Sequence, residues 1–403
     1  MDIKKREIKE KILKFTTYNV LRILGRFVSK RVNIWIFGAW HGNLFTDNSK
    51  YLYLYIKDNH SNIIPIWMTK SKDVYKQIID IGGIVYFQNT LQALYYGLIG
   101  KVYIFNIGID DVIHYSLYNA KIINLTHGMV FKKLTTDKRD VTNYSLLRRL
   151  ERKVVSKLTS SKIDGSMIDL LIATSESTKK NLSNIFACPN FKITGQPRDD
   201  IFYVNLKKDI ILNKIGLGKH KNKIIVSYLP TFRDQISSYN SITGGDNKII
   251  NNFFEHNPNI VILEKSHYNE RSSANKIHFH HTNYKNLSKT KLETQELLYV
   301  TDILITDYSG VFIDFLHLNR PIIFYPFDFE EYNKTRGIFY NYEKIVCGRI
   351  VYNLKNLLNA ILDYVENPNL DKEKRKATKK LFHNFTDGKS CQRVYSEINS
   401  IIS

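Results

Sequence analysis

Cysteine is scarce in this chain of 403 residues. The three cysteines, Cys188, Cys347 and Cys391, lie far apart and match no disulfide or zinc-binding spacing. This scarcity predicts a reducing, cytoplasmic compartment. No HExxH motif occurs either, so the sequence predicts no resident metal, and only the use of Mg²⁺ is left open.

Long hydrophobic runs are also missing. No apolar stretch approaches the roughly 18 residues that a membrane-spanning helix needs. No apolar run of signal-peptide type follows the basic N-terminus. Any membrane contact is therefore expected to be peripheral. Hydrophobic residues still make up 43% of the chain, which is enough for the cores of two ordinary domains.

Acidic residues are in short supply relative to basic ones. The 59 Lys and Arg exceed the 38 Asp and Glu, which gives a formal net charge of +21. Such an excess favours polyanions: nucleic acid, anionic lipid or phosphorylated substrates. No RNA- or DNA-binding motif is present, and the basic residues cluster on helices beside apolar faces, so we expect no nucleic-acid partner.

Several nucleotide-binding and catalytic motifs are absent as well. The chain has no GxGxxG after its first strand, no GxxxxGK[ST] and no GxSxG. Dinucleotide oxidoreductases and P-loop enzymes are therefore disfavoured, and the nucleophile elbow marked by GxSxG is not found.

The most informative stretch runs from Asp302 to Asp328. A buried strand, Ile303–Thr306, is broken sharply by Asp307-Tyr308-Ser309-Gly310. Apolar residues then recur at helical spacing from Val311 to Leu318, and a second buried strand covers Ile322–Tyr325. This unit predicts a parallel α/β sheet with a ligand at the strand ends. The turn at the helix start suits a phosphate, although a capped core helix without a ligand would give the same pattern.

The rest of the chain alternates strands and helices in the same way. The predicted strands of a first domain are Ile34–Phe37, Ile63–Trp67, Ile84–Phe87, Val102–Phe105, Ile122–Leu125 and Leu170–Ala173, and a second domain adds Ile224–Tyr228 and Ile260–Leu263. We expect one α/β domain over 1–210 and another over 211–380. A C-terminal helix is expected within 381–403, with packing back across the domains as one option for it.

A basic amphipathic segment covers residues 144–158. Its leucines and valines share one helical face, and the other face carries Arg148, Arg149, Arg152, Lys153 and Lys157. This pattern is typical of a helix that lies on anionic lipid. An ordinary surface helix packed on its own domain is the alternative.

Polar clusters follow several predicted strands. His127 comes directly after Ile122–Leu125, where it could exchange a proton in a cleft or serve only the structure. Arg198 closes the first domain, either as a phosphate ligand or as a solvated linker residue. The second domain's strand ends offer, in chain order, Thr231, Arg233, Lys265, His267, Asp307, Ser309, Gly310 and Arg336. Several cations and a helix start around one crevice predict a diphosphate site.

Taken in order, these blocks resemble the CDP-glycerol glycerophosphotransferase family, which includes the teichoic-acid primases and polymerases and related capsule enzymes. The resemblance covers residues 38 to 395. The blocks that carry it are Gly38-Ala39-Trp40-His41-Gly42, Asp47 to Tyr53, His127-Gly128, Gly195 to Asp199, Tyr228 to Arg233, Lys265-Ser266-His267, Thr306 to Ser309, Lys334 to Gly337 and Asp387 to Ser390.

The resemblance implies a GT-B fold, with two Rossmann-like domains facing across a cleft. It also implies a CDP-glycerol or CDP-ribitol donor, and a peripheral enzyme on the cytoplasmic face of the cell membrane. The expected acceptor is a lipid-linked or polymeric glycan of teichoic-acid or capsule synthesis. By position, His127 and His267 resemble the family's two essential histidines. Arg233, Asp307, Ser309 and Arg336 resemble its donor-binding set.

Two positions depart from the family pattern. Gly310 stands where a second serine is usual, and Tyr268 stands where a proline is usual. The glycine removes one hydroxyl contact to phosphate but keeps the backbone N–H donors. The tyrosine leaves the identity of the donor open.

The predicted reaction transfers an alditol phosphate to an acceptor hydroxyl and releases CMP. We expect His127 to act as general base, and His267 to stabilise the diphosphate together with Lys265 and Arg233. The alternative is a GT-B glycosyltransferase that uses a nucleotide sugar and reacts at an anomeric carbon.

Overall fold

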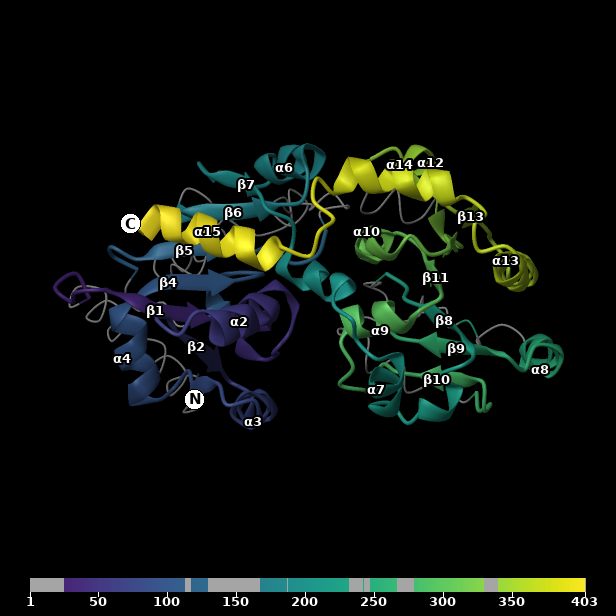
Figure 1. Cartoon of the computed structure of the whole chain (residues 1–403), viewed down its shortest axis with the longest axis horizontal. Coiled ribbons are helices and arrows are strands. Elements are labelled where there is room, and N and C mark those ends of the chain that lie inside the picture. The colour runs from purple at the N-terminus through teal and green to yellow at the C-terminus, as the bar shows by residue number, and fades with distance from the viewer. Residues whose placement is uncertain are drawn as a thin grey trace, which may run out of the picture. The chain divides into compact units, whose positions relative to one another are not determined.

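The computed structural model describes residues 25–112, 117–129, 167–186, 188–231, 242, 247–266, 279–329 and 340–402. The chain divides into two compact units (Figure 1). The first unit comprises Met1–His127, Thr135–Arg198 and Lys389–Ser403, and the second comprises Gly128–Leu134 and Asp199–Gly388. The chain therefore leaves the first unit after Arg198 and returns to it at Lys389.

The first unit is built on a seven-stranded sheet in the order β3-β2-β1-β4-β5-β6-β7, with every neighbouring pair parallel. Its strands are β1 (Arg31–Phe37), β2 (Ile64–Thr69), β3 (Ile84–Phe87), β4 (Gly100–Phe105), β5 (Lys121–Asn124), β6 (Leu170–Ala173) and β7 (Phe191–Ile193). The chain runs outward from β1 to β3 and then restarts at β4 beside β1. This reversal creates a switch point, where ligands of open α/β sheets bind.

Helices connect these strands. Those among the described residues are η1 (Trp40–Gly42), α2 (Asp47–Asn59), α3 (Lys72–Asp80), α4 (Leu91–Ile99), η2 (Ile109–Asp111) and α6 (Glu176–Ser183). Hydroxyl side chains set several helix starts: Ser71 accepts from the Val74 N–H, and Thr90 accepts from the Ala93 N–H. The last helix, α15 (Ser390–Ile402), packs on α2 and places Val394 in the core of this unit (Figure 1).

The second unit is a six-stranded parallel sheet in the order β10-β9-β8-β11-β12-β13. The strands are β8 (Ile224–Tyr228), β9 (Ile260–Glu264), β10 (Tyr284–Asn286), β11 (Ile303–Thr306), β12 (Ile322–Phe324) and β13 (Arg349–Ile350). Here the strand order reverses between β8 and β11. The same rule therefore places a second ligand crevice at the ends of these two strands.

Helices cover both faces of this second sheet. Those described are η4 (Pro197–Tyr203), α7 (Lys208–Asn213), η5 (Gly218–His220), α8 (Asn247–His256), α9 (Thr294–Val300), α10 (Val311–Phe315), η9 (Leu316–Leu318), α12 (Tyr342–Ile345), α13 (Leu354–Glu366) and α14 (Lys372–Phe382). Successive residues of β11 enter opposite cores, with Leu304 on one side and Ile303 and Ile305 on the other. This double burial explains why the strand is apolar throughout instead of alternating.

The α/β class and the parallel sheets that the sequence predicts are confirmed. The sequence missed β7, β10 and β13, which are edge strands or short strands of two or three residues. The helix predicted from Val311 is shorter than expected: α10 has five residues and continues as the 3₁₀ turn η9. Its dipole is correspondingly small, so local N–H groups matter more than the macrodipole at this turn.

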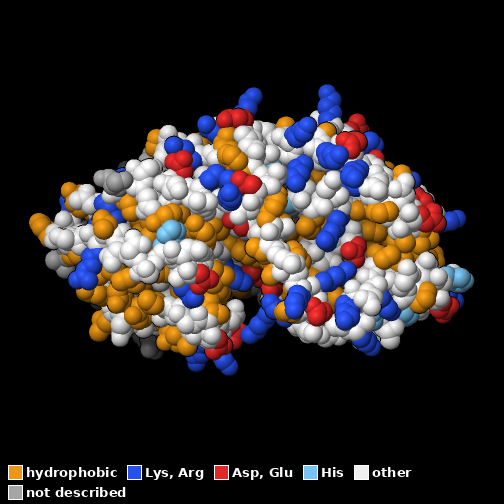
Figure 2. Space-filling model, in the orientation of Figure 1, with side chains coloured by type: hydrophobic (Ala, Val, Ile, Leu, Met, Phe, Trp, Pro, Cys, Tyr) orange, Lys and Arg blue, Asp and Glu red, His pale blue; other side chains and the backbone are white. Residues whose placement is uncertain are grey.

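No helix among the described residues is long and apolar enough to cross a membrane. The basic segment 144–158, with Arg148, Arg149, Arg152, Lys153 and Lys157, lies outside the described residues. In the space-filling view, hydrophobic side chains gather over α4 of the first unit (Figure 2). Leu91 and Tyr95 of this helix are 81% and 49% exposed.

Candidate active site

His127 lies just beyond the carboxyl end of β5, in the first unit. The preceding residue, Thr126, has a positive φ of 58°, and its N–H donates to the Asn124 side chain at 2.8 Å. This turn stops the strand and directs the chain away from the sheet. The His127 side chain keeps 39% of its surface exposed, so it can meet a substrate while remaining anchored.

A buried carboxylate holds His127. Oδ2 of Asp47, the first residue of α2, lies 2.6 Å from His127 Nδ1. Oδ1 of the same carboxylate accepts from Arg198 Nη1 at 2.8 Å. Burial by itself raises the pKa of Asp47, but the Arg198 guanidinium and the hydrogen bond with His127 outweigh it and leave that pKa well below its usual range. Asp47 is therefore an anion that joins a cation to the imidazole.

This arrangement defines what His127 can do. Because an ionised carboxylate only accepts hydrogen bonds, the imidazole proton lies on Nδ1. In the neutral form of the ring, the lone pair is then on the second nitrogen, Nε2. A carboxylate that orients an imidazole in this way is the usual partner of a general base.

Asn48 ties the surrounding segments together. Its Nδ2 donates to the carbonyls of Leu125 and Thr126 at 2.9 and 3.2 Å, and its Oδ1 accepts from the Arg198 N–H at 3.1 Å. The side chain is fully buried. The start of α2 thus fixes both the backbone before His127 and the backbone of Arg198.

The backbone close to His127 is unusually strained. Trp40, His41 and Asp47 have positive φ angles of 50°, 56° and 63°. The ring of Trp40 packs edge-on against the His127 ring, with 4.5 Å between centroids. Such conformations are costly for residues with side chains and cluster at functional sites.

Asp111 holds this strained turn in place. Its carboxylate accepts from the N–H groups of His41, Asn106 and Ile107 at 2.6, 3.0 and 3.0 Å. Burial is the largest influence on its pKa and raises it. The loops after β1 and β4, on the two sides of the switch point, are therefore joined by one buried acid.

In the second unit, Asp307 links the ends of β8 and β11. Its two oxygens accept from the Thr231 N–H at 2.9 and 3.1 Å, and Oδ1 also accepts from the Tyr308 N–H at 2.6 Å. Thr306 Oγ1 adds a bond to the Leu229 carbonyl at 2.7 Å. The predicted residues Thr231 and Asp307 are thus in direct contact at the switch point of this sheet.

Ser309 and Gly310 follow Asp307 at the start of α10. The Val311 N–H points at Ser309 Oγ over 3.4 Å, which is a long, weak bond. A Cβ on Gly310 would meet the Met129 carbonyl oxygen at 3.0 Å and the Met129 Cβ at 3.3 Å. Close approach of the Met129 backbone therefore favours glycine at this position.

The remaining predicted residues are placed differently. Lys265 follows β9, the neighbour of β8, and its ammonium donates to the Leu292 carbonyl at 2.8 Å. Arg198 belongs to the first unit, whereas Thr231, Lys265, Asp307, Ser309 and Gly310 belong to the second. Arg233, His267 and Arg336 lie outside the described residues.

Three contributors to this site had no predicted role. Asp47 and Asn48 fall within a block that carries the family resemblance, but their partners lie 80 and 77 residues away in the sequence. Asp111 lies at the end of the short turn η2, where no sequence motif marks it. A polar Asp-Asn pair directly before an apolar helix is the signal that could have identified the first two.

Two parallel sheets, each with polar side chains at its switch point, define a GT-B-like fold of two Rossmann-like domains. A solved structure, that of the wall teichoic acid polymerase TagF, has the same fold: the TM-score is 0.77 at 21% identity, over 99% of this chain and 97% of that one.

The family model described as CDP-Glycerol:Poly(glycerophosphate) glycerophosphotransferase matches residues 21–400, and the chain belongs to this family. It is similar to the teichoic acid glycerol-phosphate transferase of Staphylococcus aureus, with 26% identity over 399 residues, 96% of this chain and 98% of the relative. It is also 26% identical to the teichoic acid poly(glycerol phosphate) polymerase of Bacillus spizizenii over 360 residues, 85% of this chain and 86% of that protein. The family resemblance inferred from the motifs is thereby confirmed.

Proposed function

We propose that this enzyme transfers glycerol phosphate from CDP-glycerol to a hydroxyl of a lipid-linked or polymeric teichoic-acid acceptor. The observation that carries the proposal is the Asp47–His127 pair, in a chain that belongs to the glycerophosphotransferase family. CDP-ribitol is the second donor to be tested. Glycerol is preferred because both relatives named above carry glycerol phosphate in their names.

The proposed step is a displacement at phosphorus. The acceptor oxygen attacks the distal phosphorus of CDP-glycerol, the bond to the bridging oxygen breaks, and CMP leaves. The proton of the acceptor hydroxyl passes to Nε2 of His127. The Asp47 carboxylate stabilises the imidazolium that forms and holds the ring in the required tautomer, as in other histidine bases with a carboxylate partner.

Arg198 and Asp307 are proposed to act through other residues. Both oxygens of Asp307 already accept backbone N–H groups, and a carboxylate in contact with a diphosphate would repel it. Asp307 therefore positions the loop that carries Thr231. Arg198 is 6% exposed and paired with Asp47, so it would support His127 rather than bind phosphate.

The donor's negative charge needs cations. We assign this role to His267, Arg233 and Arg336, together with Lys265, because phosphoryl transfer relies on charge stabilisation and positioning. The backbone N–H groups at Ser309 and Gly310 would add uncharged donors. Mg²⁺ is a further source of positive charge, and the assay below includes an arm with chelator.

The direct test supplies the purified chain with labelled CDP-glycerol, CDP-ribitol or a nucleotide sugar, each with a lipid-linked glycan acceptor. We expect labelled glycerol phosphate in a phosphodiester, with one CMP released per unit added. Product size then separates single addition from polymerisation. Transfer of a sugar through a glycosidic bond, with no phosphodiester formed, would refute the proposal.

We also propose that the enzyme acts as a peripheral protein on the anionic, cytoplasmic membrane surface. Support comes from the exposed apolar side chains of Leu91 and Tyr95 on α4, with Lys30 bonded to the Leu98 carbonyl of the same helix. Exposed apolar side chains beside a lysine suit an anionic lipid surface. Flotation with anionic vesicles should be salt-sensitive and weaker for a Leu91→Ser/Tyr95→Ser variant. Equal flotation of variant and wild type would exclude this face.

A further inference from the structure

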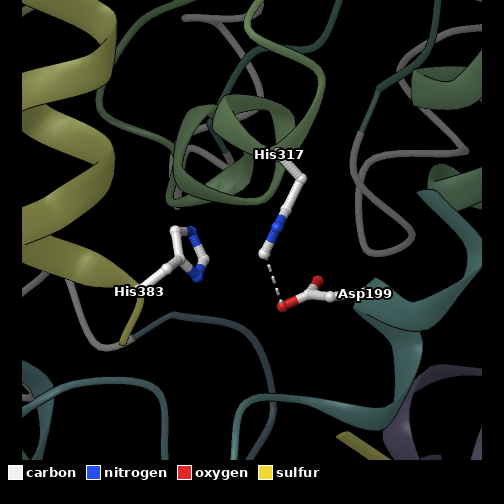
Figure 3. Close-up of side chains that lie close together, drawn as sticks. All are labelled: Asp199, His317 and His383. Atoms are coloured by element: carbon white, nitrogen blue, oxygen red, sulfur yellow. Dashed lines mark ion pairs between the residues drawn. The ribbon is translucent and has the colours of Figure 1, made fainter. Parts of the chain in front are cut away.

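Two histidines and an aspartate meet inside the second unit, among residues to which the reaction gives no role. Asp199 comes from η4, His317 from η9 and His383 from the residue after α14 (Figure 3). One potential ligand atom from each lies within 4.8 Å of the others. The side chains of Asp199 and His317 are each 3% exposed, and His383 is 5% exposed.

The protonation of His383 can be worked out from its contacts. Nε2 lies 2.9 Å from the Ile313 carbonyl oxygen, which can only accept a hydrogen bond. Nε2 therefore carries the proton. With its proton on Nε2, the ring has only Nδ1 left to offer a lone pair to a metal ion.

His317 has a neighbour at each of its two ring nitrogens. Its Nδ1 lies 2.8 Å from the Tyr203 hydroxyl, and its Nε2 lies 3.3 Å from Asp199 Oδ2. Among the described residues, Nε2 has no hydrogen-bond partner despite its burial.

The 3.3 Å separation distinguishes two explanations for the cluster. A hydrogen bond between an imidazole and a carboxylate is usually about 2.7–2.9 Å long. Two ligands of one tetrahedral zinc ion, each about 2.0–2.1 Å from the metal, lie about 3.3 Å apart. The observed spacing fits the second case. The contacts of the outer nitrogens with Ile313 and Tyr203 match the outer-shell bonds that orient metal-binding histidines.

We propose that Asp199, His317 and His383 bind one divalent transition-metal ion, with Zn²⁺ as the expected occupant. Two imidazoles and one carboxylate suit zinc chemically, and one coordination position remains for water. The Lys379 ammonium contacts the His317 backbone carbonyl at 3.2 Å and opposes the positive ion, whereas the charge of Asp199 favours it.

The role inferred for this ion is structural. It would join three segments of the second unit: its start at Asp199, the turn η9 after α10, and the residue after α14. The last of these lies only a few residues before the chain returns to the first unit at Lys389. An ion that binds only the folded state raises stability.

The test uses the full chain without a histidine tag. Elemental analysis after purification in zinc-containing medium should find about one Zn²⁺ per chain. Chelation should lower the Tm, and added Zn²⁺ should restore it. Co²⁺ should give the visible absorption band of a tetrahedral nitrogen–oxygen site. His317→Gln and His383→Gln should each weaken binding by at least about 10-fold.

His220→Gln is the matched control, because His220 is another buried histidine of the second unit, with a lowered pKa, outside the cluster. It should keep the wild-type stoichiometry and Co²⁺ spectrum. The proposal is overturned if the wild-type chain holds less than about a tenth of an equivalent of Zn²⁺ and neither Zn²⁺ nor Co²⁺ changes its Tm. It is also overturned if His317→Gln and His383→Gln bind the ion as tightly as wild type does. Should those variants not fold, the wild-type metal content and Co²⁺ spectrum decide. None of these measurements depends on the donor or acceptor.

Discussion

One carboxylate, that of Asp47, contacts His127 Nδ1 at 2.6 Å and Arg198 Nη1 at 2.8 Å. The three side chains come from three segments that are far apart in the sequence. Asp47 thereby connects the partly exposed imidazole of His127 to the buried guanidinium of Arg198. Its two contacts lead to separate predictions, one for catalysis and one for folding.

Asp47→Asn should reduce kcat by about 10²- to 10⁴-fold. The amide keeps the shape of the carboxylate but cannot stabilise the imidazolium, and it can present an N–H to the ring and so select the wrong tautomer. KM for CDP-glycerol should change little. Asp58→Asn, at an exposed acid paired with Lys57, serves as the control. Wild-type kcat in Asp47→Asn would remove Asp47 from the mechanism.

Arg198→Met should destabilise the first unit by about 3–5 kcal/mol at neutral pH, because it leaves the Asp47 carboxylate buried without its cation. The midpoint of urea unfolding should fall accordingly. The Asp47→Asn/Arg198→Met double variant should regain part of this loss, since the unpaired charge is gone. If the double variant loses the sum of the two single effects, the two residues are not coupled.

The Asp47 interaction also has a defined pH dependence. Because the pKa of Asp47 is lower in the folded state than in the unfolded chain, its stabilisation is fully present above the unfolded value of about 3.9. It is lost as the pH falls through the lower, folded value. The free energy of unfolding of wild type minus that of Asp47→Asn should therefore be constant from about pH 5 to 7 and shrink below about pH 4. A difference that grows on acidification would contradict the assigned direction of the pKa shift.

Gly310→Ser should destabilise this protein by about 1–3 kcal/mol. The added Cβ would lie 3.0 Å from the Met129 carbonyl oxygen. Ser309→Ala, at the neighbouring position, should alter the Tm much less because its hydroxyl makes only a long contact with the Val311 N–H. Thermal unfolding of both variants gives the comparison. An unchanged Tm for Gly310→Ser would show that Met129 moves at no cost.

Asp307→Ala should act on donor binding more than on turnover. It leaves the buried Thr231 N–H without its carboxylate acceptor, which costs about 1–3 kcal/mol. Release of this loop should raise KM for CDP-glycerol by about 10-fold or more, with kcat kept within a few fold. Thr301→Ala, at a buried threonine just before β11, controls for general loss of stability. A fall in kcat with unchanged KM would indicate a direct role in the chemical step.

The sequence was sufficient for the architecture but only partly for the site. Strands such as Ile303–Thr306 are apolar because both sheet faces are covered, and that pattern is visible without coordinates. Three-residue strands such as Phe191–Ile193 are half-buried and carry too little pattern to be found.

Site residues that belong to short sequence motifs could be identified from the sequence, but the residues that they contact in the folded chain could not. His127 was identifiable from its place after a strand, whereas Asp47 depends on a contact across 80 residues. That contact exists because the sheet order brings β5 near the start of α2, which local periodicity does not encode. The same reason hid the cluster of Asp199, His317 and His383, whose members share no spacing motif.

The helix α15 lies at the C-terminal end of the sequence. Its Cys391, Val394 and Ile398 nevertheless belong to the hydrophobic core of the first unit. A fragment cut after Arg198 would therefore expose an apolar groove and aggregate. Joining residues 389–403 to such a fragment through a short flexible linker should be the minimum needed to study the N-terminal half by itself.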